Sequence, residues 1–506
     1  MTSTTETGPG ATPSTGTASD APHDASDRRR WLVLGVVALA QLMVVLDATI
    51  VNIALPTAQA DLGFGNDSRQ WIVTAYALAF GSLLLVGGRL ADLVGRKPVF
   101  LVGLVGFALA SAVGGAADGF GVLVAARGAQ GVFGALLAPA ALSLLTVTFT
   151  DGRERGRAFA VFGAISGAGG AIGLILGGAL TEYLSWRWCL YVNIPIAVAA
   201  VVGALVFLPR RASRSADAPG LDVPGALLSV AGLVSLVYGL ASAETDGWTA
   251  TSTLGFIAAG VVLLVAFVVV ETRVAHPLLP MRVVTDRARG GAFVAVGVVG
   301  AGMFGVFLFL TYFLTTVLGY EPLPTGVAFL PMIVALTIAA QTSPALVARV
   351  GVKVPVALGF VVGALGMLVF TTLDVDSGYW THVFPGLVVV GLGIGLVIAP
   401  AFAAATLGVR ADDAGVASAA VNTFQQIGGS IATAVLSALA AAAATDALVG
   451  VDPSDPAAML QASVSSYTTV FAWSAGIFAV GAVVCGLLLP HGAVEHDPDA
   501  APVMAH

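Results

Sequence analysis

The sequence predicts an all-α polytopic membrane protein. Its 506 residues are 57% hydrophobic and 10% charged, with a mean hydropathy of +0.94, whereas soluble domains carry about 25% charged residues. Apolar runs of about 20 residues, long enough for a helix to cross the hydrocarbon core of a bilayer, recur along the chain. These observations exclude a soluble enzyme with a single anchor. The net charge of −7 gives no reason to expect nucleic acid as a partner.

The apolar runs predict roughly fourteen transmembrane helices, with boundaries defined to within about four residues. No soluble domain fits between them. The longest interruption, which follows Ala440 and contains Asp446, Asp452 and Pro456, is expected to be an external loop. The expected spans are 31–55, 70–88, 98–116, 120–148, 158–181, 189–208, 222–241, 252–271, 290–318, 325–348, 354–372, 382–408, 415–440 and 467–489.

The positive charges predict the side of the membrane on which each loop lies, because cytoplasmic loops are enriched in Lys and Arg. With a cytoplasmic N-terminus and alternating spans, nineteen of the 22 Lys and Arg fall inside, Arg69 and Arg187 fall outside, and Arg127 lies within a span. An odd number of spans would break this pattern. The nineteen are Arg28, Arg29, Arg30, Arg89, Arg96, Lys97, Arg153, Arg155, Arg157, Arg210, Arg211, Arg214, Arg273, Arg282, Arg287, Arg289, Arg349, Lys353 and Arg410.

Both ends of the chain are polar. Residues 1–27 are rich in Thr, Ser, Gly, Pro and Asp and are predicted to form a disordered cytoplasmic tail, and residues 491–506 a second one. The first stretch lacks the basic start and the short apolar segment of a signal peptide. A multi-pass protein of a bacterial plasma membrane is expected, since the Ala-, Gly-, Val- and Arg-rich composition is typical of a GC-rich genome.

The chain contains an internal repeat. Three groups of residues recur at offsets of 256, 261 and 259 positions, and parallel repeats about an axis normal to the membrane are a transporter architecture. The matching residues are Leu90, Gly95 and Lys97 with Leu346, Gly351 and Lys353; Pro139 with Pro400; and Gly156, Gly169 and Gly170 with Gly415, Gly428 and Gly429. The predicted organisation is an N-terminal six-helix bundle at 28–210, two inserted transmembrane helices at 211–275 and a C-terminal six-helix bundle at 276–490.

A carboxylate lies inside the first apolar run, where a charge is costly and usually marks an ion pathway, a proton relay or a ligand site. This residue is Asp47, and Arg127 is similarly placed in the fourth run. Each lies about seven or eight residues, or ~10–12 Å, from the outer end of its span. We therefore predict that the two side chains approach each other, although an arginine reaching toward the outer interface is an alternative. Burial favours the neutral acid and an arginine favours the anion, so such a carboxylate can release and rebind a proton.

A short charged stretch follows the second apolar run. Its basic residues need no explanation beyond the enrichment of positive charge in cytoplasmic loops. Its acidic residue gains nothing from that rule, and a short charged loop with two glycines can pack against a neighbouring helix end. The stretch is therefore predicted to be a gating loop, whose residues are Gly88, Asp92, Gly95, Arg96 and Lys97.

This stretch resembles the loop signature of the major facilitator superfamily. Residues 46–52 resemble the first-helix signature of its fourteen-helix drug:proton antiporters, and residues 71–76 and 186–188 fit the same family. The resemblance covers about residues 31–490. It implies two six-helix bundles around a central cavity, alternating access, and a proton-coupling role for Asp47 and Arg127.

Span five carries a row of glycines. Gly169, Gly173 and Gly177 recur every four residues and are predicted to form a smooth face for close helix packing, next to Gly178. The antiporter signature that the resemblance implies has a proline shortly before the paired glycines, and this chain has Leu174 there. That departure weakens the indication of antiport from this motif alone.

Polar and aromatic side chains within the spans are candidates for a substrate cavity, although each could instead form a hydrogen bond between helices. No span carries metal-ligand spacing, a phosphate-binding loop or a nucleophile with a base. We therefore expect neither an enzyme nor a resident metal or cofactor, and the proton is the expected coupling ion. The cavity candidates are Asn52, Tyr76, Gln130, Tyr312, Gln341, Asn422 and Gln425.

The predicted function is secondary active export of amphipathic drugs or antibiotics by proton antiport. The protein is expected to act as a monomer, with its substrate, protons and the lipid bilayer as partners. Two alternatives remain open: a proton-coupled importer or facilitator of a small metabolite on the same fold, and a non-transporting membrane sensor or scaffold. The second alternative would not need Asp47 or Arg127 inside the membrane.

Overall fold

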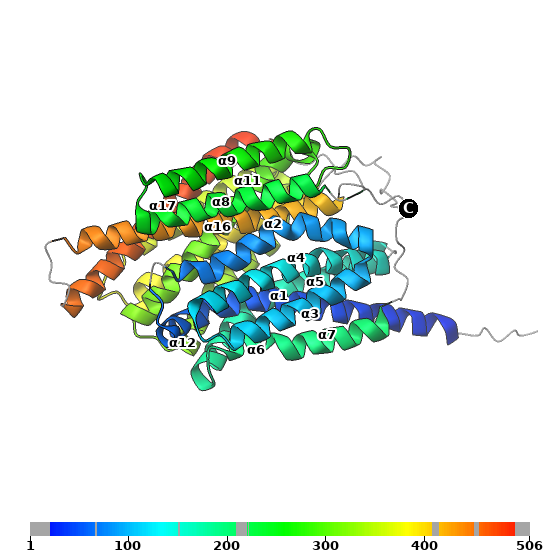
Figure 1. The fold of residues 1–506 in the computed structure, drawn as a ribbon, viewed down its shortest axis with the longest axis horizontal. Coiled ribbons are helices and arrows are strands. Elements are labelled where there is room, and N and C mark those ends of the chain that lie inside the picture. Colours follow the sequence, from blue (N-terminus) through cyan, green and yellow to red (C-terminus); the bar gives the residue numbers. More distant parts are fainter. Residues whose placement is uncertain are drawn as a thin grey trace, which may run out of the picture.

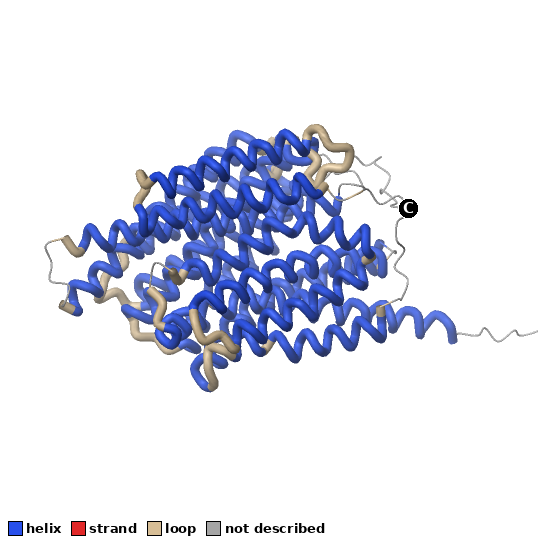
Figure 2. The backbone as a smooth tube through the Cα atoms, viewed as in Figure 1, coloured by secondary structure: helices blue, strands red, loops and turns tan. Residues whose placement is uncertain are grey.

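The computed structural model describes residues 21–65, 68–149, 152–208, 220, 222–406, 414–449 and 455–490. In this part of the chain every regular element is a helix, and most of the long helices run side by side along the long axis of the molecule (Figures 1 and 2). The remaining residues, including the predicted C-terminal tail and residues 1–20 of the predicted N-terminal tail, lie outside the described part.

The first half of the chain supplies six membrane-crossing segments, the last of which combines a short and a long helix. These helices, blue to teal in Figure 1, lie together in the lower part of that view. They are α1 (Ala21–Leu62), α2 (Gln70–Val94), α3 (Arg96–Gly115), α4 (Phe120–Thr148), α5 (Gly152–Tyr183), α6 (Trp188–Tyr191) and α7 (Asn193–Phe207).

The second half supplies the inserted pair and six further segments, two of which contain π-helical turns. The elements are α8 (Val223–Asp246), α9 (Thr251–Glu271), α10 (Met281–Val284), α11 (Arg287–Gly305), η1 (Val306–Leu310), η2 (Phe313–Val317), α12 (Pro322–Ala328), α13 (Leu330–Val350), α14 (Lys353–Phe370), η3 (Tyr379–Val383), α15 (Phe384–Thr406), α16 (Ala414–Ala447) and α17 (Pro456–Leu488).

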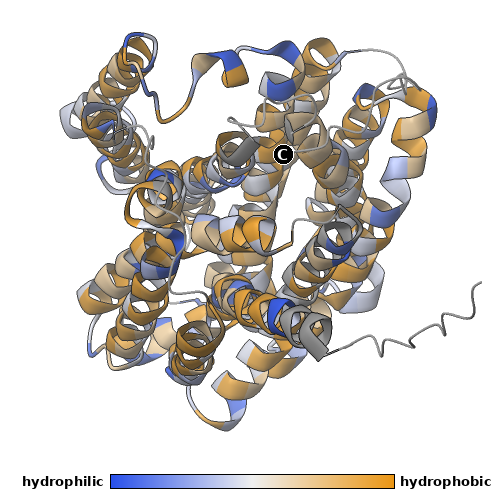
Figure 3. Ribbon diagram, turned by 90° about the vertical axis from the view of Figure 1, so that its right-hand side faces the viewer, coloured by the Kyte–Doolittle hydropathy of each residue, from blue (hydrophilic) through white to orange (hydrophobic). Residues whose placement is uncertain are grey.

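The prediction of about fourteen membrane-spanning helices is confirmed. Thirteen helices among the described residues have the length and apolar composition to cross a membrane. Helix α5 adds a segment of 32 residues, which is about 48 Å at 1.5 Å per residue. Hydrophobic residues make up much of every helix (Figure 3). Many of them are exposed on the outer surface, and Leu109, Val262 and Leu487 are more than 60% exposed. Such a surface suits lipid, since a water-soluble monomer rarely exposes apolar patches of this extent.

The two halves repeat one packing scheme. Helix α1 packs on α5, and α4 packs on both α2 and α3; correspondingly, α11 packs on α16, and α15 packs on both α13 and α14. Gly95 joins α2 to α3 with φ 110°, and Gly351 joins α13 to α14 with φ 77°, a backbone region that favours glycine. Pro139 and Pro400 lie inside the equivalent helices α4 and α15. The sequence repeat therefore corresponds to equivalent structural positions.

The inserted helices cover the seam between the halves. Helices α8 and α9 pack on each other, and α8 also contacts α2 and α16, which meet across the seam. Leu78 of α2, Leu233 and Val237 of α8 and Ala434 of α16 share one buried apolar cluster. The domain boundary at residue 210 stays a prediction, because residues 209–219 lie outside the described part of the chain.

Some helices are longer than the hydropathy of the sequence predicts. Helix α1 begins at Ala21, so the disorder predicted for residues 1–27 is wrong over 21–27; a proline in the first turn, here Pro22, does not interrupt a helix. Helix α17 begins at Pro456, where the Asp455 carboxylate accepts a hydrogen bond from the Ala457 N–H and caps the first turn. The external loop predicted after Ala440 is correspondingly shorter, because polar helix ends extend beyond the apolar core.

The glycine face of α5 lies against α1. A methyl group added at Gly169 would contact Leu42 and Val45 at 3.2 Å, and one added at Gly177 would lie 2.8 Å from an Ile50 side-chain carbon. The close approach of α1 and α5 therefore depends on the absence of side chains here.

Replacing Gly173 with alanine should destabilise the protein. Its Cβ would collide with the Thr49 hydroxyl and lie 3.1 Å from the Leu46 carbonyl oxygen, and overpacking of this kind costs about 1–3 kcal/mol. Gly170→Ala is the matched control, since nothing lies within 4 Å of the added methyl group and alanine favours a helix. Thermal unfolding in detergent should give a lower Tm for Gly173→Ala than for Gly170→Ala. Equal Tm values would contradict the packing role of this glycine.

Candidate functional site

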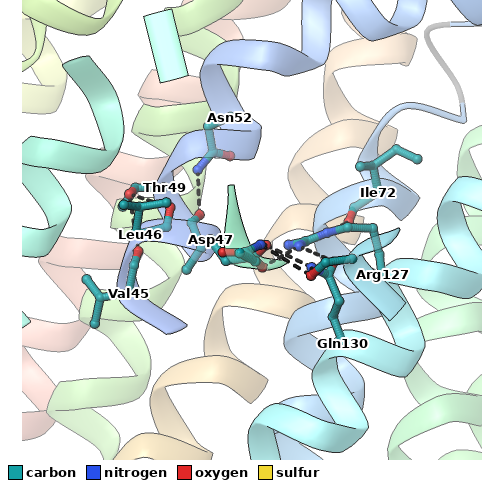
Figure 4. Close-up of polar contacts among 11 residues, drawn as sticks. Val45, Leu46, Asp47, Thr49, Asn52, Ile72, Arg127 and Gln130 are labelled. Atoms are coloured by element: carbon teal, nitrogen blue, oxygen red, sulfur yellow. Dashed lines mark hydrogen bonds and ion pairs between the residues drawn. The ribbon is translucent and has the colours of Figure 1, made fainter. Parts of the chain in front are cut away.

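Asp47 and Arg127 meet in the interior of the N-terminal helices (Figure 4). Asp47 lies on α1 and Arg127 on α4, and the Arg127 Nη1 donates to Asp47 Oδ2 over 2.6 Å. The two side chains are 0% and 2% exposed. The predicted approach of the two residues is confirmed, and their role in proton coupling stays a prediction.

Two amides and a hydroxyl complete the surroundings of the carboxylate. Asp47 Oδ1 accepts hydrogen bonds from Gln130 Nε2 at 2.8 Å and from Asn193 Nδ2 at 2.7 Å. The same two amide groups donate to Ser111 Oγ at 2.7 and 3.3 Å. All three partners are fully buried. Both carboxylate oxygens are therefore hydrogen-bonded by the protein itself.

The arginine is held by three further contacts. Arg127 Nε donates to the Ile72 carbonyl oxygen at 3.2 Å, and Nη1 also donates to Gln130 Oε1 at 2.8 Å. The guanidinium lies 4.4 Å from the centre of the Tyr76 ring, a cation–π contact. Arg127 and Gln130 are three residues apart on α4, which places them on one face of that helix. Helices α1, α2, α3, α4 and α7 thus all contribute to a single polar network.

Apolar side chains border this network. A small pocket beside Arg127 is lined by Val51, Ile72, Leu123 and Cys189. Among the described residues, no group of three or more His, Cys, Asp or Glu could hold a metal ion.

The contact between α1 and α4 depends on the charges of Asp47 and Arg127. A buried charge that loses its partner costs several kcal/mol, so the anion and the guanidinium hold each other in place. A proton on Asp47 removes the anion and with it the attraction for Arg127. Asn193 Oδ1 is buried and has no hydrogen-bond partner, so a rotated amide offers an acceptor for the protonated acid. Protonation would therefore loosen α4 from α1 without leaving the acid unbonded.

The predicted gating loop is mainly helical. Gly88 and Asp92 lie within α2, Gly95 alone is non-helical, and Arg96 and Lys97 begin α3. The expectation of a loop is wrong here because one glycine with positive φ suffices to reverse the chain. The side chain of Asp92 lies outside the described part of the structure.

Lys97 binds the end of another helix. Its Nζ donates to the Leu208 carbonyl oxygen at 2.6 Å, directly after α7, and a cation there complements the negative end of the helix. In α2, Arg89 Nη2 donates to the Pro277 carbonyl oxygen at 3.0 Å, in the segment between α9 and α10. The stretch thus ties α2 and α3 to two other parts of the molecule, and its gating role stays a prediction.

The cavity candidates lie in different places. Tyr76 and Gln130 belong to the Asp47–Arg127 network, whereas Asn52 donates to the Ala48 carbonyl of its own helix at 3.1 Å. Gln341 and Asn422 are exposed on α13 and α16.

Gln425 contacts the Met303 sulfur, with Nε2 3.8 Å away. Tyr312 lies between η1 and η2, beyond the end of α11. The substrate-binding role of these residues stays a prediction.

Tyr312 takes part in contacts between the two halves that sequence reasoning missed. Its hydroxyl donates to Gln59 Oε1 at 2.5 Å, and its ring centre lies 4.0 Å from the guanidinium carbon of Arg69. Arg69, which the charge pattern places on the outer side of the membrane, is only 8% exposed. Ser111 was also missed, although it is the only polar side chain in the apolar run 98–116, a signal that could have found it.

A second contact between the halves joins α5 to α12. The Leu323 N–H donates to Glu182 Oε2 at 3.0 Å. A methyl group added at Gly178 would lie 2.5 Å from the Leu323 Cα, and one added at Gly326 would collide with the Leu174 carbonyl oxygen. The halves are therefore packed closely at the end of the molecule where α1 is followed by α2.

Comparison with known proteins identifies the family. The family model of the Major Facilitator Superfamily matches residues 37–433. The chain belongs to the Major Facilitator Superfamily. It is thus a multi-pass membrane protein of a transporter family, and the family does not consist of enzymes.

Two curated relatives cover most of this transporter. It is 47% identical over 466 residues to the puromycin resistance protein of Streptomyces alboniger, covering 92% of each chain. It is 41% identical over 399 residues to the cephamycin export protein of Amycolatopsis lactamdurans, covering 78% of this chain and 82% of that relative. Its relatives in sequence therefore include drug and antibiotic resistance or export proteins.

A solved structure supports the fold. A bacterial homologue of the human lysosomal transporter Spinster, in an inward-facing and unoccupied conformation, matches with a TM-score of 0.65 and 14% sequence identity. The match covers 91% of this chain and 97% of that one. The predicted major facilitator fold is confirmed.

Arg127→Gln should destabilise the protein by about 3–5 kcal/mol, because Asp47 would become a buried charge without a counter-charge. Asp47→Asn should also destabilise, and the double variant should lose less than the sum of the two. Arg30 and Glu154 form an ion pair at 2.9 Å whose side chains are about one third exposed. A double-mutant cycle on this pair is the control, and its expected interaction energy is about 0–1 kcal/mol. Unfolding in detergent measures both cycles. Additive losses at Asp47 and Arg127 would contradict a mutually dependent pair.

Proposed function

We propose that this protein exports amphipathic drugs or antibiotics by exchanging them for protons. The observation that carries the proposal is the Asp47–Arg127 pair, an acid and a base buried together in the N-terminal helices. A transporter driven directly by a nucleotide would not need such a pair, whereas a proton-driven one needs a buried group that can be charged or neutral.

The pair supports a coupling cycle with two states of the acid. As an anion, Asp47 holds α1, α4 and α7 together through Arg127, Gln130 and Asn193. As a neutral acid it releases Arg127, which keeps its bonds to Ile72 and Gln130. Packed helices move as rigid bodies. A change in one contact therefore shifts the balance between two arrangements of the helices, and the helices themselves are not deformed.

The contacts between the halves support alternating access. Two sets of contacts cross the seam, Tyr312 with Gln59 and Arg69, and Leu323 with Glu182. They close the end that we place outside the cell. Export requires these contacts to separate. The π-helical turns η1 and η2 flank Tyr312, and π-helical turns often occur at functional sites. We place the gating stretch of residues 88–97 at the cytoplasmic end.

The relatives support the substrate class. Their names refer to puromycin and a cephamycin, and we propose natural-product antibiotics as substrates of this protein. The distribution of Lys and Arg supports a plasma membrane location with both termini in the cytoplasm. We propose a monomer as the functional unit.

Asp47→Asn should abolish proton-driven drug export, because an amide cannot take up and release a proton. Inside-out vesicles that carry the protein, acidified inside, would be given puromycin, and both drug accumulation and proton release would be measured. The native protein should release protons when the drug is added, and the variant should not.

Asp118→Asn is the matched control, since Asp118 is exposed in the turn before α4, and it should behave as the native protein. Coupled export that survives Asp47→Asn would reject Asp47 as the coupling site. Movement of the drug out of the vesicles together with protons would favour the alternative of a proton-coupled importer.

A further inference from the structure

Two buried carboxyl groups face each other at the base of the inserted helices. Asp222 precedes α8 and Glu271 ends α9, at the same end of the hairpin. They are only 6% and 3% exposed. Neither group takes part in the Asp47–Arg127 network.

Each carboxyl group uses one oxygen atom to bind a backbone N–H. Asp222 Oδ1 accepts from the Gly225 N–H at 2.9 Å and caps α8. Glu271 Oε2 accepts from the Leu279 N–H at 3.0 Å. These bonds fix the orientation of both side chains, so their other oxygens must point elsewhere.

The remaining oxygens point at each other. Asp222 Oδ2 and Glu271 Oε1 are both buried. Neither atom has a hydrogen-bond partner among the described residues. Both approach the same side of Gly225, where an added methyl group would lie 2.8 Å from Glu271 Oε1 and would collide with Asp222 Oδ2. The two facing oxygens therefore lie within 3 Å of one point beside Gly225. Two carboxylate oxygens in this position can only accept, so they would repel unless something lies between them.

In the described part of the chain, no basic side chain compensates the pair. Among the described residues, neither Asp222 nor Glu271 forms an ion pair. The described charged groups of the surrounding segments are Arg89 of α2, Arg273 and His276 after α9, and Arg282 of α10, and residues 209–219 before Asp222 lie outside the described part. Arg89 donates to the Pro277 carbonyl oxygen, and the other three side chains are exposed. Two buried anions without a counter-charge would cost several kcal/mol each.

We propose that Asp222 and Glu271 form a second proton-binding site, separate from Asp47, in which one proton is shared between their facing oxygens. The proton is bonded to Glu271 Oε1 and is donated to Asp222 Oδ2, which leaves the pair with a single negative charge. Every carboxyl oxygen then has a partner. A proton is the ligand that this geometry fits, because Gly225 lies against both oxygens and leaves little room for a larger cation.

The shared proton fastens three segments to one another. It joins the start of α8 to the end of α9, and the Leu279 N–H ties Glu271 to the segment that leads into the C-terminal helices. Arg89 of α2 binds the same segment two residues earlier, at Pro277. Loss of the proton would place two negative charges face to face and push this junction apart, beside the stretch that we propose as a gate.

The test compares the pH dependence of stability in the full-length protein and in variants. The folded pair holds a proton that separated carboxyl groups in the unfolded chain release at lower pH, so native stability should fall as pH rises from mildly acidic to neutral values. One linked proton changes the unfolding equilibrium constant by up to about tenfold per pH unit. In Glu271→Gln or Asp222→Asn an amide N–H replaces the shared proton, so this part of the pH dependence should disappear from Tm measured in detergent.

Glu321→Gln is the matched control, because Glu321 is exposed and its side chain caps nothing; it should keep the native profile. Infrared spectra should also show a carboxylic acid band near neutral pH that is lost in both amide variants. The proposal is overturned if Glu271→Gln leaves the native pH profile and this band unchanged. A Tm that follows Na⁺ or K⁺ concentration at fixed pH, and not pH itself, would assign the site to a metal cation instead.

Discussion

The structure depends on how one charge is compensated inside the membrane. Asp47 cannot be left unpaired in hydrocarbon, so the chain brings an arginine, two amides and a hydroxyl to it from three other helices. These bonds fix how α1, α3, α4 and α7 pack. In the proposed cycle the same bonds respond to a single proton, since neutralising the acid would remove the charge that the others surround.

Glycines provide the close helix contacts that the polar network requires. In a membrane the hydrophobic effect does not drive helices together. Their association depends on close packing and on hydrogen bonds between them. The face of Gly169, Gly173 and Gly177 lets α5 lie directly on α1, the helix that carries Asp47. The neighbouring Gly178 lets α5 touch α12 of the other half. One helix thus links the helix of the buried acid to the contact between the halves.

The two proposed proton sites differ in their counter-charge, and this difference gives them different roles. Asp47 has a guanidinium partner, so its anion is stable and protonation releases a contact. Among the described residues Asp222 and Glu271 have no basic partner, so in our proposal their junction is stable with a proton and weakened without one. The inserted helices cover the seam formed by α2 and α16, and their attachment therefore affects the surface across which the halves move.

The sequence by itself determined the class of fold, the number of spans, the repeat and the unusual acid, because apolar length, glycine spacing and an isolated charge are local signals. It also placed Asp47 and Arg127 at one depth, since depth follows from counting residues along a helix. Only the tertiary structure decided that Ser111 and Asn193 join them, that Tyr312 meets Arg69, and that Glu271 faces Asp222. These contacts depend on the rotation of each helix about its axis and on which helices are neighbours. Packing between distant segments sets both, and hydropathy along the chain does not record either.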